Sequence, residues 1–506
     1  MKYCKAYYFF LMIFCFSCGS LIKNTKNTPE REFRGVWIAS VVNIDWPKSG
    51  KDSIKKQQND FIEILEFYRK LHFNAVIVQI RTAGDALYPS KLAPWSRFLT
   101  GKEGVPPRPY YDPLTWMISE SHQRGFEFHA WLNPYRATFD LDTSILDQTH
   151  DYHLHPEWMI KYGKKYYYNP GLPGVQQHLV SVINEVVKNY DIDAIHFDDY
   201  FYPYKIKDEV FDDQLSYQQY AKSDQSIEDW RRENVNTLIR SIHTNIKARK
   251  PWVQFGISPF GVWRNKSVDP AGSDTEAGQT TYDDLYADPL TWMQKGWIDY
   301  LAPQVYWSLN HPKASYKKLV RWWNENNNST NIYIGNGAYK VRNNPDRAWN
   351  KKKQLSKQIK LARKADNISG NIFFSAKSLL HQHNDITAQL SKNIYQQPSL
   401  PPSHVKEKRI DIAPKFSSRK VYKDSVTLFF KNDTTTTLRA VIVYHSKNNM
   451  SIFPPKIINE HIVITVPISM TTNKKPITIT YLDIYRREST PYQFNTMLIR
   501  NTEANE

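Results

Sequence analysis

The sequence has almost no cysteine. Its three cysteines, Cys4, Cys15 and Cys18, all lie within the first 18 of 506 residues. The body of the chain therefore offers no disulfide, no thiol nucleophile and no cysteine-based zinc site. Glycine-rich phosphate loops and Gly-x-Ser-x-Gly elbows are also missing, which argues against nucleotide chemistry and esterase chemistry. We expect no metal ion and no cofactor.

Long apolar runs are missing as well. The apolar stretch at residues 6–16 is too short to cross a bilayer, and it stands between two lysines and Ser17-Cys18-Gly19, as in an export signal. We expect residues 1–18 to be a bacterial lipoprotein signal peptide, with Cys18 acylated, and residues 19–30 to be a flexible tether. The alternative is an ordinary secretory peptide, because Cys15 stands where leucine is usual. The expected location is outside the cytoplasm, lipid-anchored to the cell envelope, with the outer membrane favoured.

The chain has few acidic residues relative to basic ones, and its formal net charge is +17. The lysines and arginines are scattered, and an exported protein meets little nucleic acid, so we expect no nucleic-acid partner. An envelope glycan or an anionic membrane surface is a more natural partner for this charge. We slightly favour a solvated basic surface without any such role.

Strand patterns alternate with helix patterns through most of the chain, which predicts a (β/α)8 barrel of the TIM type over residues 31–395. The spacing predicts eight strands, at residues 32–42, 75–81, 126–133, 192–198, 253–258, 300–307, 332–335 and 371–375. It predicts helices at residues 53–71, 113–124, 175–190, 227–249, 290–295, 315–324 and 345–365.

The composition changes after the predicted barrel. Residues 396–408 are rich in proline, as in a stiff linker. Residues 409–506 contain short β-type segments at 426–430, 438–445, 461–467 and 477–485, which predicts a small all-β sandwich of the fibronectin type III or immunoglobulin kind. No catalytic cluster falls there, so we expect a spacer or docking module.

The stretch IDAIHFDDYFYPY, residues 192–204, ends the fourth predicted strand with two adjacent acids, Asp198 and Asp199. In a (β/α)8 barrel the ends of the strands and the loops after them form the active site. The alternative is that both acids only cap a turn. The remaining sequence favours catalysis.

Five predicted strands alternate apolar and polar residues, whereas strands buried on both faces usually read as continuous apolar runs. A buried polar group costs on the order of 1 to 3 kcal/mol when it is unpaired. We therefore expect a hydrated or ligand-filled mouth where these side chains meet. The first strand is an exception, because Arg34 falls in register with apolar residues; we place it at the closed end. The expected inward-facing residues are Gln79, Arg81, Glu127, His129, Trp131, Asn133, His196, Asp198, Gly256, Ser258, Gln304 and Tyr306.

Aromatic residues are frequent at the same strand ends, and aromatic rings stack on the apolar faces of sugars. Any single ring is more often ordinary packing, but the set favours a carbohydrate groove. It consists of Trp37, Trp46, Trp95, Trp131, Tyr135, Tyr200, Tyr202, Trp263, Tyr306 and Trp307.

Glycoside cleavage usually needs two separated carboxyl groups, and no later strand ends in a second acid. An adjacent pair suits substrate-assisted hydrolysis, in which the acetamide of a 2-acetamido sugar attacks the anomeric carbon. Our hypothesis has Asp198 hold the acetamide N–H and Asp199 protonate the leaving oxygen; the two roles are exchangeable. The loop acids that remain as candidates are Asp45, Asp85, Glu276, Asp283 and Asp284.

Seven segments resemble the bacterial glycosyl-hydrolase-like family ten and span about residues 31 to 385. They are FRGVWIASVVNIDWP, VIVQIRTAGDALYPS, FEFHAWLNPYRA, IHFDDYFYPY, ISPFGVWRN, the segment from Asp269 through TYDDLYADP, and YLAPQVYWS. The resemblance implies an exported barrel glycosidase, and some members act on peptidoglycan glycan strands that have lost their peptides. It implies Asp198 and Asp199 at the centre and a groove lined by Arg81, Asn133, Tyr200, Gln304 and Tyr306.

Together these patterns predict an exported glycoside hydrolase acting on an N-acetylhexosamine polysaccharide, with peptidoglycan strands as the favoured substrate. The alternatives are a non-catalytic glycan-binding lipoprotein and a glycosidase for host or capsular polysaccharide. The predicted catalytic residues are Asp198 and Asp199. The predicted substrate-binding residues are Arg81, Trp131, Asn133, Tyr135, His196, Tyr200, Ser258, Trp263, Gln304, Tyr306 and Trp307.

Overall fold

The computed structural model describes residues 31–327, 329–433, 435–446, 449–470 and 476–495. The expected signal peptide with Cys18, the expected tether and the last 11 residues of the expected sandwich, 496–506, lie outside this range. Within it, no helix combines the length and the apolar character that crossing a membrane requires.

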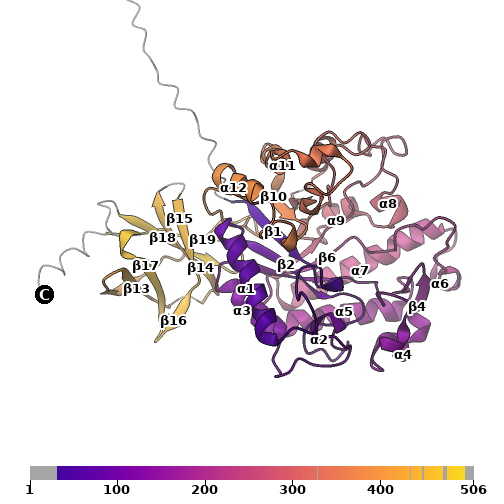
Figure 1. Cartoon of the computed structure of the whole chain (residues 1–506), viewed down its shortest axis with the longest axis horizontal. Coiled ribbons are helices and arrows are strands. Elements are labelled where there is room, and N and C mark those ends of the chain that lie inside the picture. The colour runs from indigo at the N-terminus through magenta and orange to yellow at the C-terminus, as the bar shows by residue number, and fades with distance from the viewer. Residues whose placement is uncertain (1–30, 328, 434, 447–448, 471–475, 496–506) are drawn as a thin grey trace, which may run out of the picture.

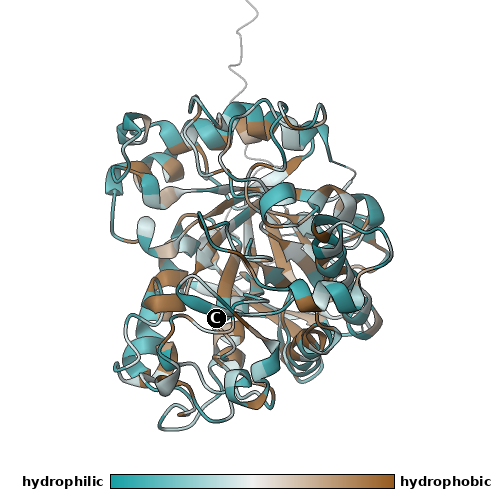
Figure 2. Cartoon of the chain, turned by 90° about the vertical axis from the view of Figure 1, so that its right-hand side faces the viewer, coloured by the Kyte–Doolittle hydropathy of each residue, from teal (hydrophilic) through white to brown (hydrophobic). Residues whose placement is uncertain are grey.

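Eight parallel strands form a closed barrel, which confirms the predicted (β/α)8 architecture. β1 pairs with both β2 and β10 and so closes the ring. Looking from the side opposite the C-terminal sheets, Figure 2 shows apolar strands at the centre and helices around them. The strands are β1 (Phe33–Ile38), β2 (Ala75–Arg81), β3 (Glu127–Leu132), β6 (Ala194–Phe197), β7 (Gln254–Ile257), β8 (Tyr300–Leu301), β9 (Asn331–Asn336) and β10 (Ile368–Phe373).

The helices of the outer layer begin where the sequence supplies caps. Ser53 accepts a hydrogen bond from the backbone N–H of Lys56 at the start of α1, and Asp112 caps α3 in the same way. The outer helices are α1 (Ile54–Lys70), α3 (Pro113–His122), α5 (Pro173–Asn189), α7 (Ile227–Arg249), α9 (Pro289–Lys295), α10 (Tyr316–Glu325), α11 (Gln354–Ala362) and α12 (Asn384–Asn393). The loops carry α2 (Arg97–Thr100), α4 (Asp151–Leu154), α6 (Gln214–Tyr220), α8 (Thr281–Asp284) and a hairpin of β4 (Met159–Tyr162) and β5 (Lys165–Tyr168).

Three predicted elements differ from the structure. The first strand ends at Ile38, because the backbone N–H of the next residue, Ala39, donates to the Asp45 side chain at 2.8 Å and not to a neighbouring strand. The sixth is only two residues long, since Pro303 lacks the N–H that a continuing ladder needs. The helix predicted at 345–365 divides into a short 3-10 helix, Arg347–Asn350, and α11.

The barrel strands separate two packed layers, as the alternation predicts. Val78, Phe128 and Phe255 belong to the large cluster between strands and helices, whereas Ile77 and Tyr300 belong to a smaller cluster inside the ring. Arg34 lies at the closed end, where its Nε donates to Glu32 at 2.7 Å and its Nη1 donates to the carbonyl of Gln397 at 2.8 Å. The exception in the first strand is thereby explained.

The C-terminal residues form two sheets that share one apolar cluster, to which Leu428, Val443 and Tyr481 belong. The pairing is antiparallel apart from β11 with β19. One sheet contains β11 (Arg409–Ile410), β14 (Leu438–Ser446), β15 (Asn449–Phe453), β18 (Ile477–Asp483), β19 (Glu488–Ser489) and β20 (Tyr492–Phe494). The other contains β12 (Phe416–Val421), β13 (Ser425–Lys431), β16 (Lys456–Ile458) and β17 (His461–Pro467).

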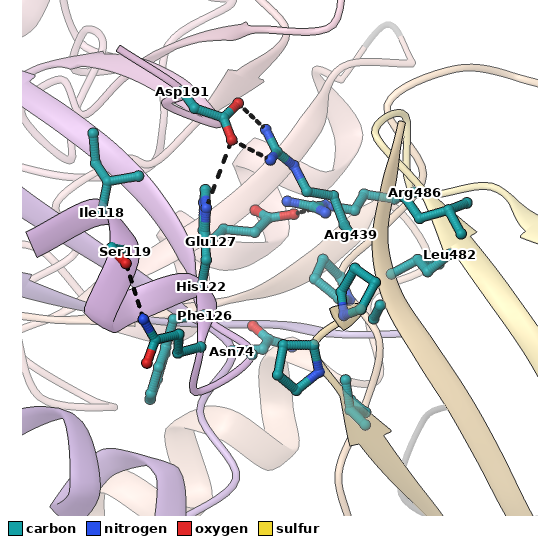
Figure 3. Close-up of a pocket in the computed structure, with 18 of the residues that line it drawn as sticks. Asn74, Ile118, Ser119, His122, Phe126, Glu127, Asp191, Arg439, Leu482 and Arg486 are labelled. Atoms are coloured by element: carbon teal, nitrogen blue, oxygen red, sulfur yellow. Dashed lines mark hydrogen bonds and ion pairs between the residues drawn. The ribbon is translucent and has the colours of Figure 1, made fainter. Parts of the chain in front are cut away.

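These C-terminal sheets lie beside the barrel, at the end where its strands begin (Figure 1). Arg486 forms ion pairs with Glu127, the first residue of β3, and at 2.6 Å with Asp193, just before β6. Arg439 donates two hydrogen bonds, of 2.6 and 2.7 Å, to the carboxylate of Asp191 (Figure 3). Arginines from the C-terminal module thus balance the charges of buried carboxylates at the end of the barrel where its strands begin.

The proline-rich segment between the two parts is docked on the barrel. The carbonyl of Leu400 accepts from the N–H of Glu32 at 2.9 Å, and the carbonyl of Ser399 accepts from Asn74 at 2.9 Å. Leu400 also joins Ala440 and Ile442 in a small apolar cluster. A cavity of about 520 Å³ remains between α3 and the C-terminal sheet (Figure 3).

Candidate active site

A cavity of about 420 Å³ opens at the ends of the barrel strands, opposite the C-terminal sheets. Both Asp198 and Asp199 line it. Its other lining residues are Trp37, Ala39, Val41, Ile44, Gln79, Trp131, Arg136, Tyr200, Tyr204, Ser258, Phe260, Gln304, Tyr306, Trp307, Tyr339, Lys340 and Phe374. The cavity therefore combines two acids, two basic side chains and many aromatic rings.

Asp198 is the first residue after β6 and is buried. Burial raises the pKa of its carboxyl to about 7, and the nearby negative charge of Asp199 adds to this shift. Arg136 and a hydrogen bond from Asn133 lower the pKa only in part. Asp198 therefore holds a proton over a range in which an ordinary aspartate has lost it.

Asp199 follows directly and is equally buried. Burial raises the pKa of its carboxyl, and a hydrogen bond donated by the Tyr204 hydroxyl lowers it. The two carboxyl groups thus line one cavity but have different partners. Different partners are what separates an acid that donates a proton from one that stays ionised.

Asn133 positions both Asp198 and the loop after β3. Its Nδ2 lies 3.0 Å from each carboxyl oxygen of Asp198, and its Oδ1 accepts from the backbone N–H of Arg136 at 3.0 Å. Asn133 follows β3, which pairs with β6, so the two side chains meet at the same edge. One amide therefore fixes the acid and the turn that carries Arg136.

A chain of buried hydrogen bonds runs from the cavity wall down the barrel axis. The indole N–H of Trp37 donates to Nε2 of His196 at 3.2 Å, so His196 carries its proton on Nδ1, which lies 2.8 Å from the Tyr300 hydroxyl. Tyr300 then donates to Nδ1 of His129 at 2.8 Å, and Nε2 of His129 donates to Glu127 at 3.0 Å. Burial holds the pKa of His196 well below its usual value.

This chain of hydrogen bonds changes what we expected of the inward-facing polar residues. Only the upper part of the barrel interior is an open mouth, because the lower polar groups satisfy one another. The inward polar residues of the sequence pattern therefore serve two purposes: those near the strand ends form the site, and those below it fill the core.

The structure brings most of the predicted site residues together. Eight line the cavity: Trp131, Asp198, Asp199, Tyr200, Ser258, Gln304, Tyr306 and Trp307. Asn133 and His196 contact lining residues from below, since Asn133 bonds Asp198 and His196 bonds the Ser258 hydroxyl at 3.0 Å.

Three predicted binding residues do not line this cavity. Arg81 is buried and donates to the Tyr168 hydroxyl at 3.2 Å. Tyr135 is fully buried in the layer between strands and helices. Trp263 stacks on Trp322, with ring centroids 5.8 Å apart. Arg81 ends β2 after a register shift between Gln79 and Arg81, which turns its side chain away from the cavity. Tyr135 and Trp263 lie in loops after β3 and β7, and these loops turn their side chains into protein packing.

The remaining loop acids do not line the cavity either. Asp45 accepts from the Ser375 hydroxyl and from the N–H of Lys377, both at 2.8 Å, and so joins the ends of β1 and β10. Asp85 caps a turn by accepting from the N–H of Thr82 at 2.8 Å. Asp283 and Asp284 pair with Arg264 and Lys205. Asp198 and Asp199 are the acids at this site within the described residues.

The sequence patterns do not predict several of the cavity residues, of which Arg136 and Tyr204 are the most informative. Both lie in segments that the resemblance already marked, NPYRA and FDDYFYPY. Strand periodicity does not extend into loops, so it gave no signal for them. In the part of the chain that the structure describes, no three His, Cys, Asp or Glu side chains gather as metal ligands would.

Comparisons with known proteins agree with the predicted family. The model of the family "Glycosyl hydrolase-like 10" matches residues 32–351. The glycosyl hydrolase YngK of Bacillus subtilis is 49% identical over 377 residues, 74% of each chain. The glycosyl hydrolase DigH of Escherichia coli K12 is 38% identical over 379 residues, 70% of this chain and 85% of that one.

Among solved structures, the PgaB glycoside hydrolase domain of Bordetella bronchiseptica is 12% identical with a TM-score of 0.47, covering 72% of this chain and 99% of that chain. The family model covers more than half of the present sequence, and both relatives match over more than two thirds of it. The resemblance noted from the seven motifs is confirmed. The chain therefore belongs to the glycosyl hydrolase-like 10 family, a family of glycoside hydrolases.

Proposed function

We propose that this protein hydrolyses glycosidic bonds in a polysaccharide of N-acetylated hexosamines, with peptidoglycan glycan strands as the favoured substrate. The observation that carries the proposal is the pair Asp198 and Asp199 at the cavity, where burial and mutual repulsion raise the pKa of Asp198 to about 7. A carboxyl group that keeps its proton near neutral pH is suited to protonate a leaving oxygen.

The environments of the two acids favour exchanging the roles of the initial hypothesis. Asp198, with the pKa of about 7, is the general acid. Asp199, stabilised as a carboxylate by Tyr204, accepts a hydrogen bond from the acetamide N–H of the sugar. The acetamide oxygen attacks the anomeric carbon while the bond to the leaving oxygen breaks, and that oxygen takes the proton of Asp198.

The second half of the reaction returns the enzyme to its first state. Asp198, now ionised, removes a proton from a water molecule that attacks the anomeric carbon and opens the cyclic intermediate. Two successive displacements at one carbon retain its configuration. Retention therefore distinguishes this mechanism from a direct attack by water.

The rest of the cavity suits a sugar chain. The rings of Trp131, Tyr200, Tyr306 and Trp307 line its wall, and their faces match the apolar faces of hexosamines. Gln79 offers a buried Nε2 that nothing in the described residues accepts from, so a sugar oxygen can take this hydrogen bond. Both relatives named above are glycosyl hydrolases, which agrees with this proposal.

Digestion of peptide-free peptidoglycan strands, chitin oligosaccharides, and host and capsular polysaccharides tests the proposal. We expect new reducing ends and shorter acetamido-sugar oligomers by mass spectrometry. We expect proton NMR to show retained configuration at the anomeric carbon. Binding of these polymers without any new reducing end would favour a glycan-binding lipoprotein. Cleavage confined to host or capsular polymers would favour the other alternative.

We also propose that the protein is exported and anchored to the cell envelope through a lipid on Cys18, as the pattern at residues 1–18 suggests. Mass spectrometry of the N-terminal peptide of the mature protein tests this. We expect an acylated Cys18 and expect Cys18→Ala to release the protein from membranes. An unmodified N-terminus would indicate an ordinary secretory peptide.

For the C-terminal sheets we propose a sandwich of the fibronectin type III or immunoglobulin kind. The shared apolar cluster between the two sheets supports this. An experimental structure with the same strand order as those folds tests the proposal, and a different order would exclude it.

A further inference from the structure

Glu127 links the C-terminal module to the inside of the barrel. It is the first residue of β3, only 2% exposed, and its Oε1 accepts a hydrogen bond from Nε of Arg486 (Figure 3). Nε2 of His404 lies farther away, 3.6 Å from the same oxygen. Burial raises the pKa of Glu127, but the charge of Arg486 and the hydrogen bond from His129 outweigh this and hold the pKa well below its usual value. Glu127 is therefore a carboxylate ion, which accepts hydrogen bonds and donates none.

The other end of the hydrogen-bond chain that starts at Glu127 lies at the wall of the active-site cavity. Trp37 and Ser258 both line the cavity, and they contact Nε2 of His196 at 3.2 and 3.0 Å. An indole N–H can only donate, so this nitrogen must carry no proton if it is to accept from Trp37. The hydroxyl of Ser258 then donates to the same nitrogen or to the carbonyl of Phe197 at 3.3 Å, which leaves its oxygen as an acceptor at the cavity wall.

Two histidines and one tyrosine join these two ends. The Tyr300 hydroxyl lies 2.8 Å from Nδ1 of both His196 and His129. Nε2 of His129 in turn lies 3.0 Å from Glu127. All three rings are fully buried, so bulk water offers them no other partner. The protons of the chain therefore have two arrangements, with every donor pointing towards Glu127 or every donor pointing towards the cavity.

Only one of these arrangements satisfies both ends of the chain. With every donor pointing towards Glu127, the carboxylate accepts from His129. The indole of Trp37 then finds an unprotonated nitrogen on His196. The reverse arrangement would require the carboxylate to donate, and it would set two N–H groups against each other at the cavity wall. Unsatisfied buried donors are costly, so the reverse arrangement is excluded as long as Glu127 is ionised.

We infer that Arg486 is a positioning residue for the glycosidase site. It keeps Glu127 an acceptor and thereby fixes the tautomer of His196. That tautomer holds Trp37 and Ser258 at the cavity wall. Arg486 itself does not line the cavity, so the C-terminal module takes part in the site through the chain of hydrogen bonds. The inference rests on the proposed function for its kinetic readout alone.

Glu127→Gln tests the direction of the chain most sharply. Arginine can only donate, so the amide oxygen of the new side chain faces Arg486 and its NH2 group faces His129. We expect His129 to accept at Nε2 and to carry its proton on Nδ1, which is the reverse of the wild type. Neutron diffraction, or nitrogen NMR of protein labelled at histidine, locates these ring protons.

The same change should slow the turnover of peptide-free glycan strands. Reversal leaves the Trp37 indole opposite a protonated nitrogen and displaces the wall of the site. We therefore expect kcat/KM to fall at least about fivefold. Asp191→Asn is the matched control, because Asp191 also pairs with an arginine of the module, Arg439, but lies outside the chain. It should keep the wild-type tautomers and the wild-type kcat/KM.

Variants of Arg486 test its own part in the chain. Without the arginine, burial raises the pKa of Glu127, so we expect Arg486→Gln to reproduce the reversed tautomer. Arg486→Lys keeps the charge and should keep the wild-type tautomers, as should Arg439→Gln. Tyr300→Phe breaks the chain, so adding Arg486→Gln to it should not lower kcat/KM further. Two independent losses would add instead.

A proton on Nε2 of His129 in Glu127→Gln, or an unchanged kcat/KM in that variant, would overturn the inference and leave the proposed function intact. A proton on Nε2 of His196 in the wild type would overturn it as well. If Glu127→Gln does not fold, the same two readouts from Arg486→Gln decide, with Arg439→Gln as the control. If the wild type cleaves no glycan, the proposed function fails and the ring protons alone decide. Reversal in Glu127→Gln then supports the inference, and wild-type tautomers overturn it.

Discussion

The proton on Asp198 depends on where the side chain lies. Burial and the charge of Asp199 raise its pKa to about 7, so the protonated acid is lost as the pH rises above that value. We predict that kcat falls about tenfold per pH unit on the alkaline side of the profile. Steady-state rates between pH 5 and 9 measure this. A profile that stays flat to pH 9 would contradict the assignment of Asp198 as the acid.

Tyr204 controls the ionisation of the second acid. Its hydroxyl donates to Asp199 and lowers the pKa of that carboxyl, which burial alone would raise further. Tyr204→Phe removes this hydrogen bond, so the pKa of Asp199 rises and its ionisation needs a higher pH. We predict that the acidic limb of the pH–rate profile moves to higher pH in this variant. An unchanged acidic limb would show that the limb does not report on Asp199.

The same burial makes Asp198 a burden on stability. The pKa of Asp198 is raised in the folded state. Its contribution to the free energy of unfolding is therefore most favourable below the pKa of the unfolded state, near 4, and is lost as the pH rises towards 7. We predict that Asp198→Asn increases the free energy of unfolding at pH 8 by on the order of 2 to 4 kcal/mol. At pH 4 the variant and the wild type should unfold alike. Urea titrations at both pH values measure the difference, and an equal gain at pH 4 would point to another cause.

At the scale of elements, the hydrogen-bond chain inside the barrel joins four strands. Tyr300 of β8 lies between His196 of β6 and His129 of β3, 2.8 Å from each, while Trp37 of β1 bonds His196. The chain needs one tautomer of each histidine, so the loss of a single hydroxyl leaves two ring nitrogens without partners. The polar core is therefore stable only as a complete set.

Tyr300→Phe tests the importance of this chain. We predict that it lowers the free energy of unfolding by on the order of 2 to 4 kcal/mol, because two buried groups lose their partner. Tyr110→Phe, which removes a hydroxyl from a side chain that is 67% exposed, is the matched control and should change little. Denaturant titration measures both. Equal stability of the wild type and Tyr300→Phe would mean that the two histidines find other partners.

At the scale of the whole molecule, the barrel and the C-terminal module depend on each other. Arg486 and Arg439 come from the module, and the buried Glu127 and Asp193 come from the floor of the barrel. Removing the module leaves these carboxylates with fewer partners and exposes the apolar residues around Leu400. These contacts indicate that the module contributes to the stability of the barrel, and the spacer or docking role expected from sequence stays a prediction.

A chain that ends at residue 408 tests this dependence. We predict that its thermal midpoint lies about 5 °C or more below that of the full chain, since breaking a buried ion pair costs about 3 to 5 kcal/mol. Circular dichroism melts of both proteins provide the measurement, and Arg486→Gln should fall between them. A truncated chain with the same thermal midpoint as the full chain would show that the stability of the barrel does not depend on the module.

Local sequence patterns predict the order of the barrel strands and the position of the two acids. Alternation in Ala75–Arg81 correctly places Val78 outward and Gln79 in the cavity, but a register shift after Gln79 turns Arg81 away from it. Asp198 follows a strand whose end is marked by an aromatic loop. Loops have no such alternation of apolar and polar residues, so it does not predict where their side chains point. Arg136 enters the cavity and Trp263 leaves it because of tertiary packing, and the contact of Arg486 with Glu127 joins residues 359 apart in the chain.

In the proposed reaction Asp198 and Asp199 act together on an N-acetylated sugar, so both should be needed for turnover. The most direct measurement is the turnover of peptide-free glycan strands by Asp198→Asn and by Asp199→Asn, each checked for folding by its thermal midpoint. We predict that each variant loses at least about 100-fold in kcat, because each removes a distinct role in the reaction. A wild-type rate in either folded variant would contradict this prediction.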